Sequence, residues 1–173
     1  MPDVFTRAKR SQVMSRIRSR GNRDTELALV ALFRRLGITG WRRHWELRSP
    51  KSEVRSLDSG TRRPPSGFRP RASGIRRFRV RPDFVFPTLR VAVFVDGCFW
   101  HACPLHATRP KHRAAFWRQK LAANQARDRK VNRALRAAGW RVLRIWEHEL
   151  ATRLEARLAQ RIRRFLDAFS APR

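Results

Sequence analysis

Acidic side chains are scarce in this sequence. Only 13 Asp and Glu stand against 41 Lys and Arg in 173 residues, which gives a formal net charge of +28. The excess is spread along the chain, because only part of it falls in the arginine-rich segment 48–79. This charge indicates a polyanionic partner, and counterion release from nucleic acid would supply much of the affinity. Ribosomal and histone-like proteins share the composition, so charge alone does not separate a nucleic-acid binder from an enzyme.

Long apolar runs are missing as well. No apolar segment near the first residues resembles the core of a signal peptide, and no run of about 18 apolar residues could cross a membrane. We therefore expect a cytoplasmic protein without membrane contact. The length allows one hydrophobic core, so we expect a single domain over residues 1–173, acting as a monomer.

The spacing of apolar residues predicts an α/β fold with a mixed central sheet flanked by helices. A central strand is expected at Val91–Val95, where every residue is apolar, as in strands covered on both faces. Asp83–Phe86 should pair antiparallel with it across a Pro87-Thr88 turn. The other expected elements are a helix from Asp24 or Thr25 to Gly37, a strand over 41–47, a helix over 114–138, a strand over 141–146 and a helix over 149–168.

Residues 48–79 lack any such periodicity. Prolines at positions 50, 64, 65 and 70 are interspersed with Ser, Gly and Arg. The segment carries too little apolar surface to offset the entropy of ordering the chain. We expect a mostly disordered basic insertion that contacts DNA without specificity.

The only two cysteines, Cys98 and Cys103, lie in a loop rich in histidine. With His106 they form a C-x4-C-x2-H spacing that a tetrahedral zinc can accept, and His148 is the candidate fourth ligand. In a reducing compartment such a group favours a metal site over a disulfide. The spacing is equally compatible with two buried reduced cysteines beside two surface histidines.

Two carboxylates flank the expected strand pair. Asp83 opens the first strand and Asp96 follows the second, so both can converge on one edge and supply oxygen ligands for Mg²⁺. The lysine usual two positions after the second acid is absent, because Cys98 stands there. His101 is the natural substitute as general base or acid. In the alternative reading, Asp83 closes a turn and His101 caps a loop.

Aromatic residues form a third group. Phe99 and Trp100 lie between the candidate ligands, and Phe116 and Trp117 begin the long helix. Aromatic wedges that enter between base steps deform a DNA duplex. Ordinary core packing explains the same residues equally well.

Taken together, these residues resemble the very-short-patch repair (Vsr) endonuclease family, whose members nick DNA at T:G mismatches. The resemblance covers Arg10–Gly37 and Arg81–Leu150 and leaves out the insertion. The matching strings are Arg10-Ser11-Gln12-Val13-Met14, Arg81-Pro82-Asp83-Phe84, Gly97-Cys98-Phe99-Trp100-His101, Phe116-Trp117, Arg127-Asp128-Arg129 and Gly139-Trp140-Arg141-Val142-Leu143. The Gly-Cys-Phe-Trp-His string is highly specific.

The resemblance implies a restriction-endonuclease-like α/β core with a structural zinc loop. It implies that Asp83 and the backbone carbonyl of Val95 ligate a catalytic Mg²⁺. It makes His101 the general base and places Glu26 near the metal-bound waters.

Two further sets of residues follow from the resemblance. The zinc ligands would be Cys98, Cys103, His106 and His148. The intercalating aromatics would be Phe99, Trp100 and Trp117, and the contacts to the mismatched bases would be Met14, Lys120 and Asn124.

The chain departs from the family prototype at Val95-Asp96, where the prototype has Thr-His. A second site histidine is thereby lost, and Asp96 could itself become a metal ligand. The zinc loop differs too, with His148 at a cysteine position, although nitrogen and thiolate ligands both suit zinc.

The leading hypothesis is a Mg²⁺-dependent endonuclease that nicks one strand of double-stranded DNA at or near T:G mismatches, with mismatch-repair factors as candidate partners. A relaxed-specificity nickase serving DNA modification or defence is the alternative enzyme. A non-catalytic zinc-stabilised nucleic-acid binder is the alternative from another class. The separation of Asp83 from His101 discriminates enzyme from binder.

Overall fold

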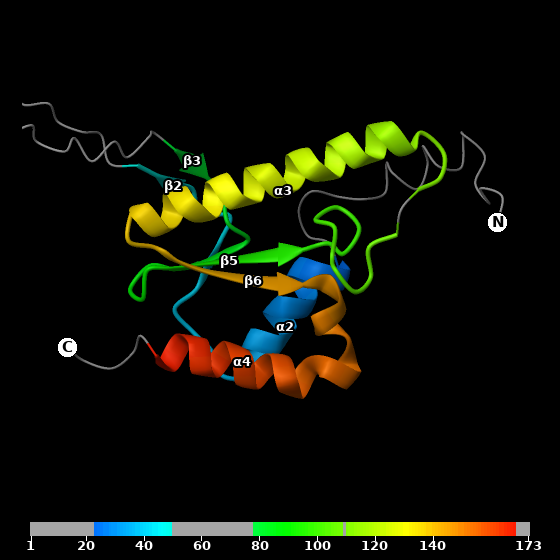
Figure 1. Ribbon diagram of the computed structural model, residues 1–173. Coiled ribbons are helices and arrows are strands. Elements are labelled where there is room, and N and C mark those ends of the chain that lie inside the picture. Colours follow the sequence, from blue (N-terminus) through cyan, green and yellow to red (C-terminus); the bar gives the residue numbers. More distant parts are fainter. Residues whose placement is uncertain (1–22, 50–77, 109, 169–173) are drawn as a thin grey trace, which may run out of the picture.

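The computed structural model describes residues 23–49, 78–108 and 110–168 (Figure 1). Its helical elements are η1 (Arg23–Leu27), α2 (Ala28–Arg35), α3 (Ala114–Ala137), η2 (Glu147–Leu150), η3 (Thr152–Leu154) and α4 (Glu155–Asp167). Its strands are β1 (Arg42–Arg43), β2 (Leu47–Arg48), β3 (Arg79–Val80), β4 (Phe84–Phe86), β5 (Val91–Asp96) and β6 (Arg141–Trp146). None of the described helices is both long and apolar enough to cross a membrane.

The main sheet has four strands in the order β1-β4-β5-β6. β4 runs antiparallel to β5, with Phe84 opposite Val93. β6 runs parallel to β5, with Phe94 opposite Arg144, and α3 forms the crossover that a parallel pair requires. The predicted mixed sheet flanked by helices is therefore confirmed.

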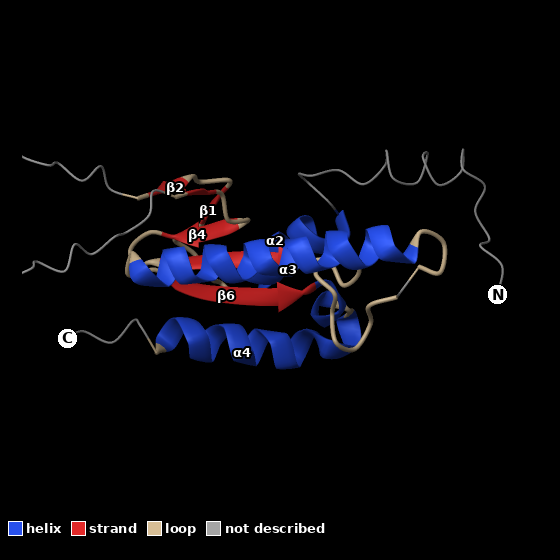
Figure 2. Ribbon diagram, turned by 45° about the horizontal axis from the view of Figure 1, so that its top comes forward, coloured by secondary structure: helices blue, strands red, loops and turns tan. Residues whose placement is uncertain are grey.

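Different helices cover the two faces of this sheet. α3 lies across one face, and α2 and α4 lie across the other (Figures 1 and 2). Along β5 the side chains alternate: Val91 and Val93 join the core beneath α2 and α4, whereas Ala92 and Phe94 join the smaller core beneath α3. By the same alternation, Asp96 belongs to the face of α3.

The single strand predicted over 41–47 is wrong. β1 and β2 belong to different sheets, and His44 lies between them in the left-handed region with φ 54°. A residue in this conformation turns the chain out of a strand, so β1 ends at Arg43. The turn brings His44 close to Glu26, with His44 Nε2 at 3.0 Å from Glu26 Oε1.

The first helical segment begins near the predicted residues, as a π-helical turn that continues into α2, whereas the last helix begins later than predicted. Asp24 and Thr25 lie in η1, and α2 starts only at Ala28 with no side-chain cap. α4 starts at Glu155 instead of 149, because two tight turns follow β6. Glu149 stabilises the first turn, since its Oε2 accepts a hydrogen bond from the Trp146 amide at 2.8 Å. The strand pair at 84–96, the long helix and the strand over 141–146 agree with the predictions.

The ends of segment 48–79 are ordered, which corrects its predicted boundaries. Arg48 pairs with Arg79, and Leu47 pairs with Val80, in the two-stranded β2–β3 sheet. Pairing is possible because Leu47 is buried and joins the core beneath α3. Residues 50–77 lie outside the described residues, so their predicted disorder stays a prediction.

Candidate active site and metal centre

Asp83 lies just before β4 and is fixed against β5. The Val95 amide donates to Asp83 Oδ2 at 2.8 Å, which places the Val95 peptide beside the carboxylate. Burial raises the pKa of Asp83; the Val95 hydrogen bond opposes the shift, and the negative charges of Glu26 and Asp96 add to it. A buried carboxylate close to two other acids is an environment that a divalent cation would stabilise.

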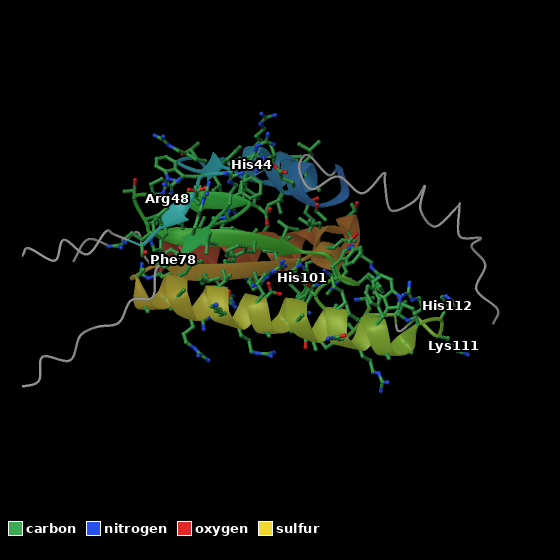
Figure 3. The ribbon with its side chains drawn as sticks, turned by 90° about the horizontal axis from the view of Figure 1, so that it is seen from above. His44, Arg48, Phe78, His101, Lys111 and His112 are labelled. Atoms are coloured by element: carbon green, nitrogen blue, oxygen red, sulfur yellow. The ribbon has the colours of Figure 1, made fainter. Side chains whose placement is uncertain are left out.

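Glu26 reaches this cluster from η1 and is only 5% exposed. Its Oε1 lies 3.0 Å from His44 Nε2 and 3.3 Å from Arg43 Nη1. The His44 amide in turn donates to the Asp83 carbonyl at 3.4 Å. η1, β1 and the start of β4 therefore meet at one place, and Figure 3 shows His44 on the side of η1 and α2.

Asp96 ends β5 and is 3% exposed. Arg144 from β6 binds it with both arms of its fork, with Nε at 2.5 Å from Oδ2 and Nη2 at 2.6 Å from Oδ1. Burial alone would lower the pKa of Arg144, but its hydrogen bonds with Asp96 and Asp128 and their negative charges raise it. Both oxygens of Asp96 are thus engaged by Arg144, which makes this carboxylate a poorer metal ligand than Asp83.

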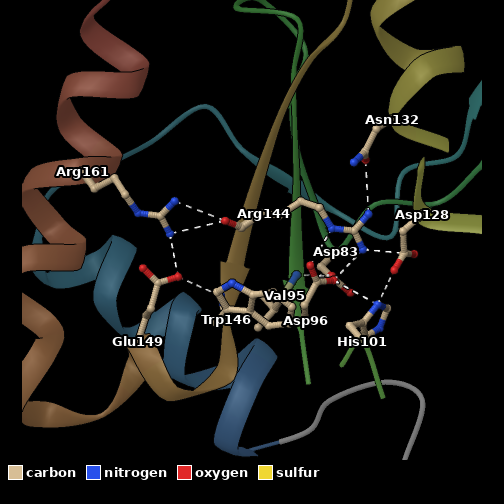
Figure 4. Close-up of polar contacts among 10 residues, drawn as sticks. All are labelled: Asp83, Val95, Asp96, His101, Asp128, Asn132, Arg144, Trp146, Glu149 and Arg161. Atoms are coloured by element: carbon tan, nitrogen blue, oxygen red, sulfur yellow. Dashed lines mark hydrogen bonds and ion pairs between the residues drawn. The ribbon is translucent and has the colours of Figure 1, made fainter. Parts of the chain in front are cut away.

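His101 lies between β5 and α3, in the loop that follows β5 (Figure 3). Its Nδ1 is 2.6 Å from Asp128 Oδ2 and 3.6 Å from Asp96 Oδ1. Figure 4 shows Asp83, Asp96 and His101 gathered at the same edge of the sheet. The carboxylate and the imidazole that the nuclease hypothesis requires are therefore on one side of the molecule.

The loop after β5 is held along one face of α3. Phe99 packs against Trp117, with ring centroids 5.2 Å apart, and Asn124 Nδ2 donates to the Trp100 carbonyl at 2.9 Å. The next loop residue, His101, meets the helix one turn further on. Positions 117, 124 and 128 share a helical face, so successive loop residues contact successive positions on that face.

Phe99, Trp100 and Trp117 form one aromatic cluster. The Trp100 ring centroid lies 5.1 Å from that of Phe99 and 6.0 Å from that of Trp117. Phe116 is 49% exposed, and Lys120 is exposed on the same helix. The cluster is half-buried and lies outside the two cores, as a DNA-contacting surface requires. The DNA contacts of these residues stay predictions, and Met14 lies outside the described residues.

The four expected zinc ligands come together. One ligand atom from each of Cys98, Cys103, His106 and His148 lies within 4.8 Å of the others. The His148 Nδ1 atom is 3.2 Å from Cys98 Sγ and 3.6 Å from Cys103 Sγ, and Cys103 Sγ is 3.9 Å from His106 Nδ1. A tetrahedral zinc with its usual bond lengths places ligand atoms roughly 3.3–3.8 Å apart. The donor set suits a zinc ion, and the three separations given above lie close to this range.

The Cys98 thiol lies in an environment that disfavours the thiolate when no metal is present. Burial raises the pKa of Cys98, and the neighbouring Cys103 thiol raises it further against the opposing hydrogen bond from His148. Glu147, next to His148, accepts a hydrogen bond from the Cys98 amide at 3.0 Å. The start of η2 thus holds the loop both by a backbone contact and by a candidate ligand.

Three residues of the site were given no role from the sequence. Asp128 had a signal, because it is an acid on the apolar stripe of the long helix. Arg144 had a weaker one, as a charge in the middle of an apolar strand. His44 had none, since a histidine after two arginines is typical of an ordinary surface.

Sequence comparisons bear directly on this site. Residues 65–106, which include Asp83, Asp96, His101 and both cysteines, match the family model described as DNA mismatch endonuclease Vsr. The type II nicking enzyme V.NaeI of Lentzea aerocolonigenes is 56% identical over 71 residues, 41% of this chain and 43% of that protein. The DNA mismatch endonuclease Vsr of Escherichia coli (strain K12) is 44% identical over 75 residues, 42% of this chain and 47% of that protein. The chain thus spans about half the length of these two relatives.

A third relative matches from end to end. The type II nicking enzyme V.NmeAIP of Neisseria meningitidis serogroup A is 30% identical over 172 residues, 97% of this chain and 99% of that protein. The mixed sheet with helices on both faces fits the fold of such a nuclease. This chain therefore belongs to the Vsr family of DNA endonucleases.

Proposed function

We propose that this chain is a metal-dependent DNA endonuclease that nicks one strand of duplex DNA at or near T:G mismatches. The observation that carries the proposal is the convergence of Asp83 and His101 at the end of β5, with His101 hydrogen-bonded to Asp128. The net charge of +28 supports a polyanionic substrate.

Asp83 and the carbonyl of Val95 would hold a magnesium ion. Oxygen ligands suit this hard cation, and Asp83 forms no ion pair with lysine or arginine within residues 23–49, 78–108 and 110–168. Asp96 is the poorer candidate because Arg144 already occupies both its oxygens. When bound, magnesium stabilises the negative charge that develops on the scissile phosphate.

His101 would accept the proton of the attacking water. If Nδ1 donates to Asp128, as their 2.6 Å separation allows, Nε2 would be the ring atom that takes that proton. The water oxygen bonds to phosphorus and the bond to the 3′ oxygen breaks; the 3′ oxygen takes a proton from solvent water, which leaves a 5′ phosphate and a 3′ hydroxyl. Glu26, buried beside Asp83, would orient water at the cation.

We propose zinc as the occupant of the group formed by Cys98, Cys103, His106 and His148. It would hold a loop whose middle residue is His101, so its role is to fix the position of the general base. Metal binding would also give the sulfur atoms of buried Cys103 and partly buried Cys98 a strong bonding partner. A cytoplasmic monomer that works with mismatch-repair factors remains our prediction.

A second candidate is a nickase that is not confined to mismatches. Two of the relatives described above are named type II nicking enzymes, which favours this alternative over a non-catalytic binder. The two enzymes differ only in which duplexes they cut.

The test is a nicking assay with the full chain and Mg²⁺ on labelled duplexes that differ only in a T:G mismatch or a T:A pair. Asp83→Asn is the site variant, and Asp167→Asn, at the exposed end of α4, is the matched control. We expect the wild type and Asp167→Asn to nick the mismatched duplex, and EDTA or Asp83→Asn to stop the reaction. Equal nicking of both duplexes would establish the second candidate, and intact strands with either Mg²⁺ or Mn²⁺ would refute both.

A further inference from the structure

A single arginine joins the polar groups around His101. Arg144 binds both oxygens of Asp96, and its Nη2 lies 3.1 Å from Asp128 Oδ1. Its Nη1 donates to Asn132 Oδ1 at 3.2 Å, and its guanidinium lies over the Phe94 ring at 5.1 Å. Every arm of the fork therefore has a partner from β5 or α3 (Figure 4).

This placement follows from the parallel pairing of β5 and β6. Arg144 is opposite Phe94, and Asp96 is two residues further along β5, on the same face of the sheet. Asp128 and Asn132 come from adjacent turns of α3, which lies across that face. The guanidinium thus bridges the sheet and the helix directly behind the loop that carries His101.

Without Arg144, the negative charges of Asp96 and Asp128 would lie close together with no guanidinium to neutralise them. The side chains of Asp96 and Asp128 are only 5% and 17% exposed, and the Nδ1 atom of His101 faces both. Each Asp128 oxygen has a different partner: Oδ2 holds His101 and Oδ1 holds Arg144. A carboxylate held at both oxygens cannot rotate, and this fixes the ring that it binds.

We propose that Arg144 is a positioning residue that fixes the orientation and tautomer of His101 by clamping Asp128 against Asp96. Arg144 makes no contact with the reacting groups and works through Asp128. The proposal rests on the proposed endonuclease function for its catalytic consequence, while its structural part concerns His101 alone.

Lysine cannot replace this arginine fully. A single ammonium group can neutralise one carboxylate but cannot present the planar fork that binds Asp96 and Asp128 together. Arg144→Lys should therefore keep part of the effect. The double variant Asp96→Asn/Arg144→Gln removes both charges of the buried pair and leaves two amides that can bond to each other, so it separates charge neutralisation from clamping.

The experiment compares the wild-type chain, the double variant, Arg144→Lys and the matched control Arg163→Gln, an exposed position on α4. Three quantities are measured: the kcat and KM of nicking, the thermal midpoint, and the ¹⁵N shifts of the His101 ring in histidine-labelled protein. His101→Gln identifies the ring signals. The shifts report which ring nitrogen carries the proton, whether or not the chain nicks DNA.

We expect the double variant to melt near the wild type, to lose about 100-fold in kcat with KM nearly unchanged, and to give His101 a mixture of tautomers. Arg144→Lys should fall between the two, and Arg163→Gln should match the wild-type kcat. A double variant with wild-type kcat would show that Arg144 only neutralises Asp96, and would overturn the proposal.

Unchanged His101 ring shifts in both Arg144 variants would overturn it as well. If the double variant does not fold, Arg144→Lys provides the test. Wild-type kcat and unchanged His101 ring shifts in that variant would overturn the proposal. A wild-type chain that nicks no duplex would remove the proposed function, and the ring shifts would still decide whether Arg144 fixes His101.

Discussion

The two faces of the central sheet differ in the side chains that pack against them. Beneath α2 and α4, the sheet buries a large apolar core, with Phe33 and Ile162 fully enclosed. Beneath α3 the buried apolar core is small, and the 24-residue helix contributes only Leu135 as a buried residue. The helix also contacts the sheet and loop through the ring of Trp117 and through the polar side chains of Asn124 and Asp128.

This difference indicates which face of the sheet stabilises the fold and which face carries the chemistry of the nuclease. An apolar face gains free energy from burial, whereas buried charges contribute little net stability and are costly when unpaired. We therefore expect changes on the face of α2 and α4 to lower stability. Changes on the face of α3 and at its edge should lower activity more than stability.

The loop that we propose to bind zinc belongs to neither face, and loss of that metal should have the largest effect of all. Structural zinc sites supply on the order of 10 kcal/mol in small zinc-dependent folds, and the Cys98 loop has no apolar core of its own. We expect about one zinc per purified chain, as metal analysis would measure. His148→Ala should lose the metal and lower the thermal midpoint strongly, while His112→Ala, at an exposed position nearby, should keep both. Full zinc content in His148→Ala would show that His148 is not a ligand.

Asp83→Asn should give the clearest separation of activity from stability. Losing the proposed metal ligand removes several kcal/mol of charge stabilisation, so nicking should fall at least about 1,000-fold. The stability of Asp83→Asn, in contrast, should be kept or raised at neutral pH. Because burial raises the pKa of Asp83 in the folded chain above its ordinary value, the folded state binds more protons between the two values, and stability falls as pH rises through that window.

Asp83→Asn has no carboxylate to ionise, so it does not lose stability in this way when the pH rises above the two pKa values. We therefore expect its thermal midpoint at neutral pH, without added metal, to equal or exceed that of the wild type. Scanning calorimetry at pH 4 and pH 7 would measure this, with the advantage of the variant growing towards pH 7. A strongly destabilised Asp83→Asn would show that the carboxylate supports the fold, and would break the contrast between the faces.

Phe33→Ala tests the opposite face. Phe33 is fully buried and lies 5.3 Å from Phe84 and 5.7 Å from Phe86 between ring centroids. Its truncation should lower the free energy of unfolding by about 3–5 kcal/mol, measured by denaturant titration. Leu121→Ala, on half-buried α3, should cost clearly less. Similar losses in the two variants would mean that the faces contribute equally to stability.

Asn124→Ala should have the smallest effect. It removes one hydrogen bond from the side chain to the Trp100 carbonyl, worth about 1 kcal/mol. We expect a slight loss of stability and a moderate rise in the KM for DNA, because the aromatic loop is less well held. Gln119→Ala, exposed on the same helix, should change neither. A variant with unaltered KM would indicate that the loop is positioned without Asn124.

Much of the fold could be predicted from the sequence because its elements carry strong local signals. The apolar run at Val91–Val95, the turn before it and the long helix were placed well. The strand over 41–47 was not, because the left-handed backbone at His44 has no signature in the residue types around it. The start of α4 was missed because Glu149 accepts a hydrogen bond from the Trp146 amide three residues earlier, which closes a separate tight turn before the helix.

The site was predictable to the extent that single motifs carried it. The loop from Cys98 to His106 and its distant partner His148 converge as expected. The role of Asp96 was harder to foresee, because strand register decides that Arg144 faces it. Pairings between residues far apart in sequence depend on register, and register is a property of the assembled sheet.

α3 also sets the distance between the aromatic cluster and the polar group around His101. Trp117 and Asp128 lie on one straight element, and at the rise of an α-helix they are about 16 Å apart along its axis. If aromatic side chains distort the duplex at one end while a proton is accepted at the other, the spacing between the distortion and the cut is set by helix geometry. An insertion of one residue into this stretch would rotate the two ends out of line, so the position of the nick would be lost before the helix itself was.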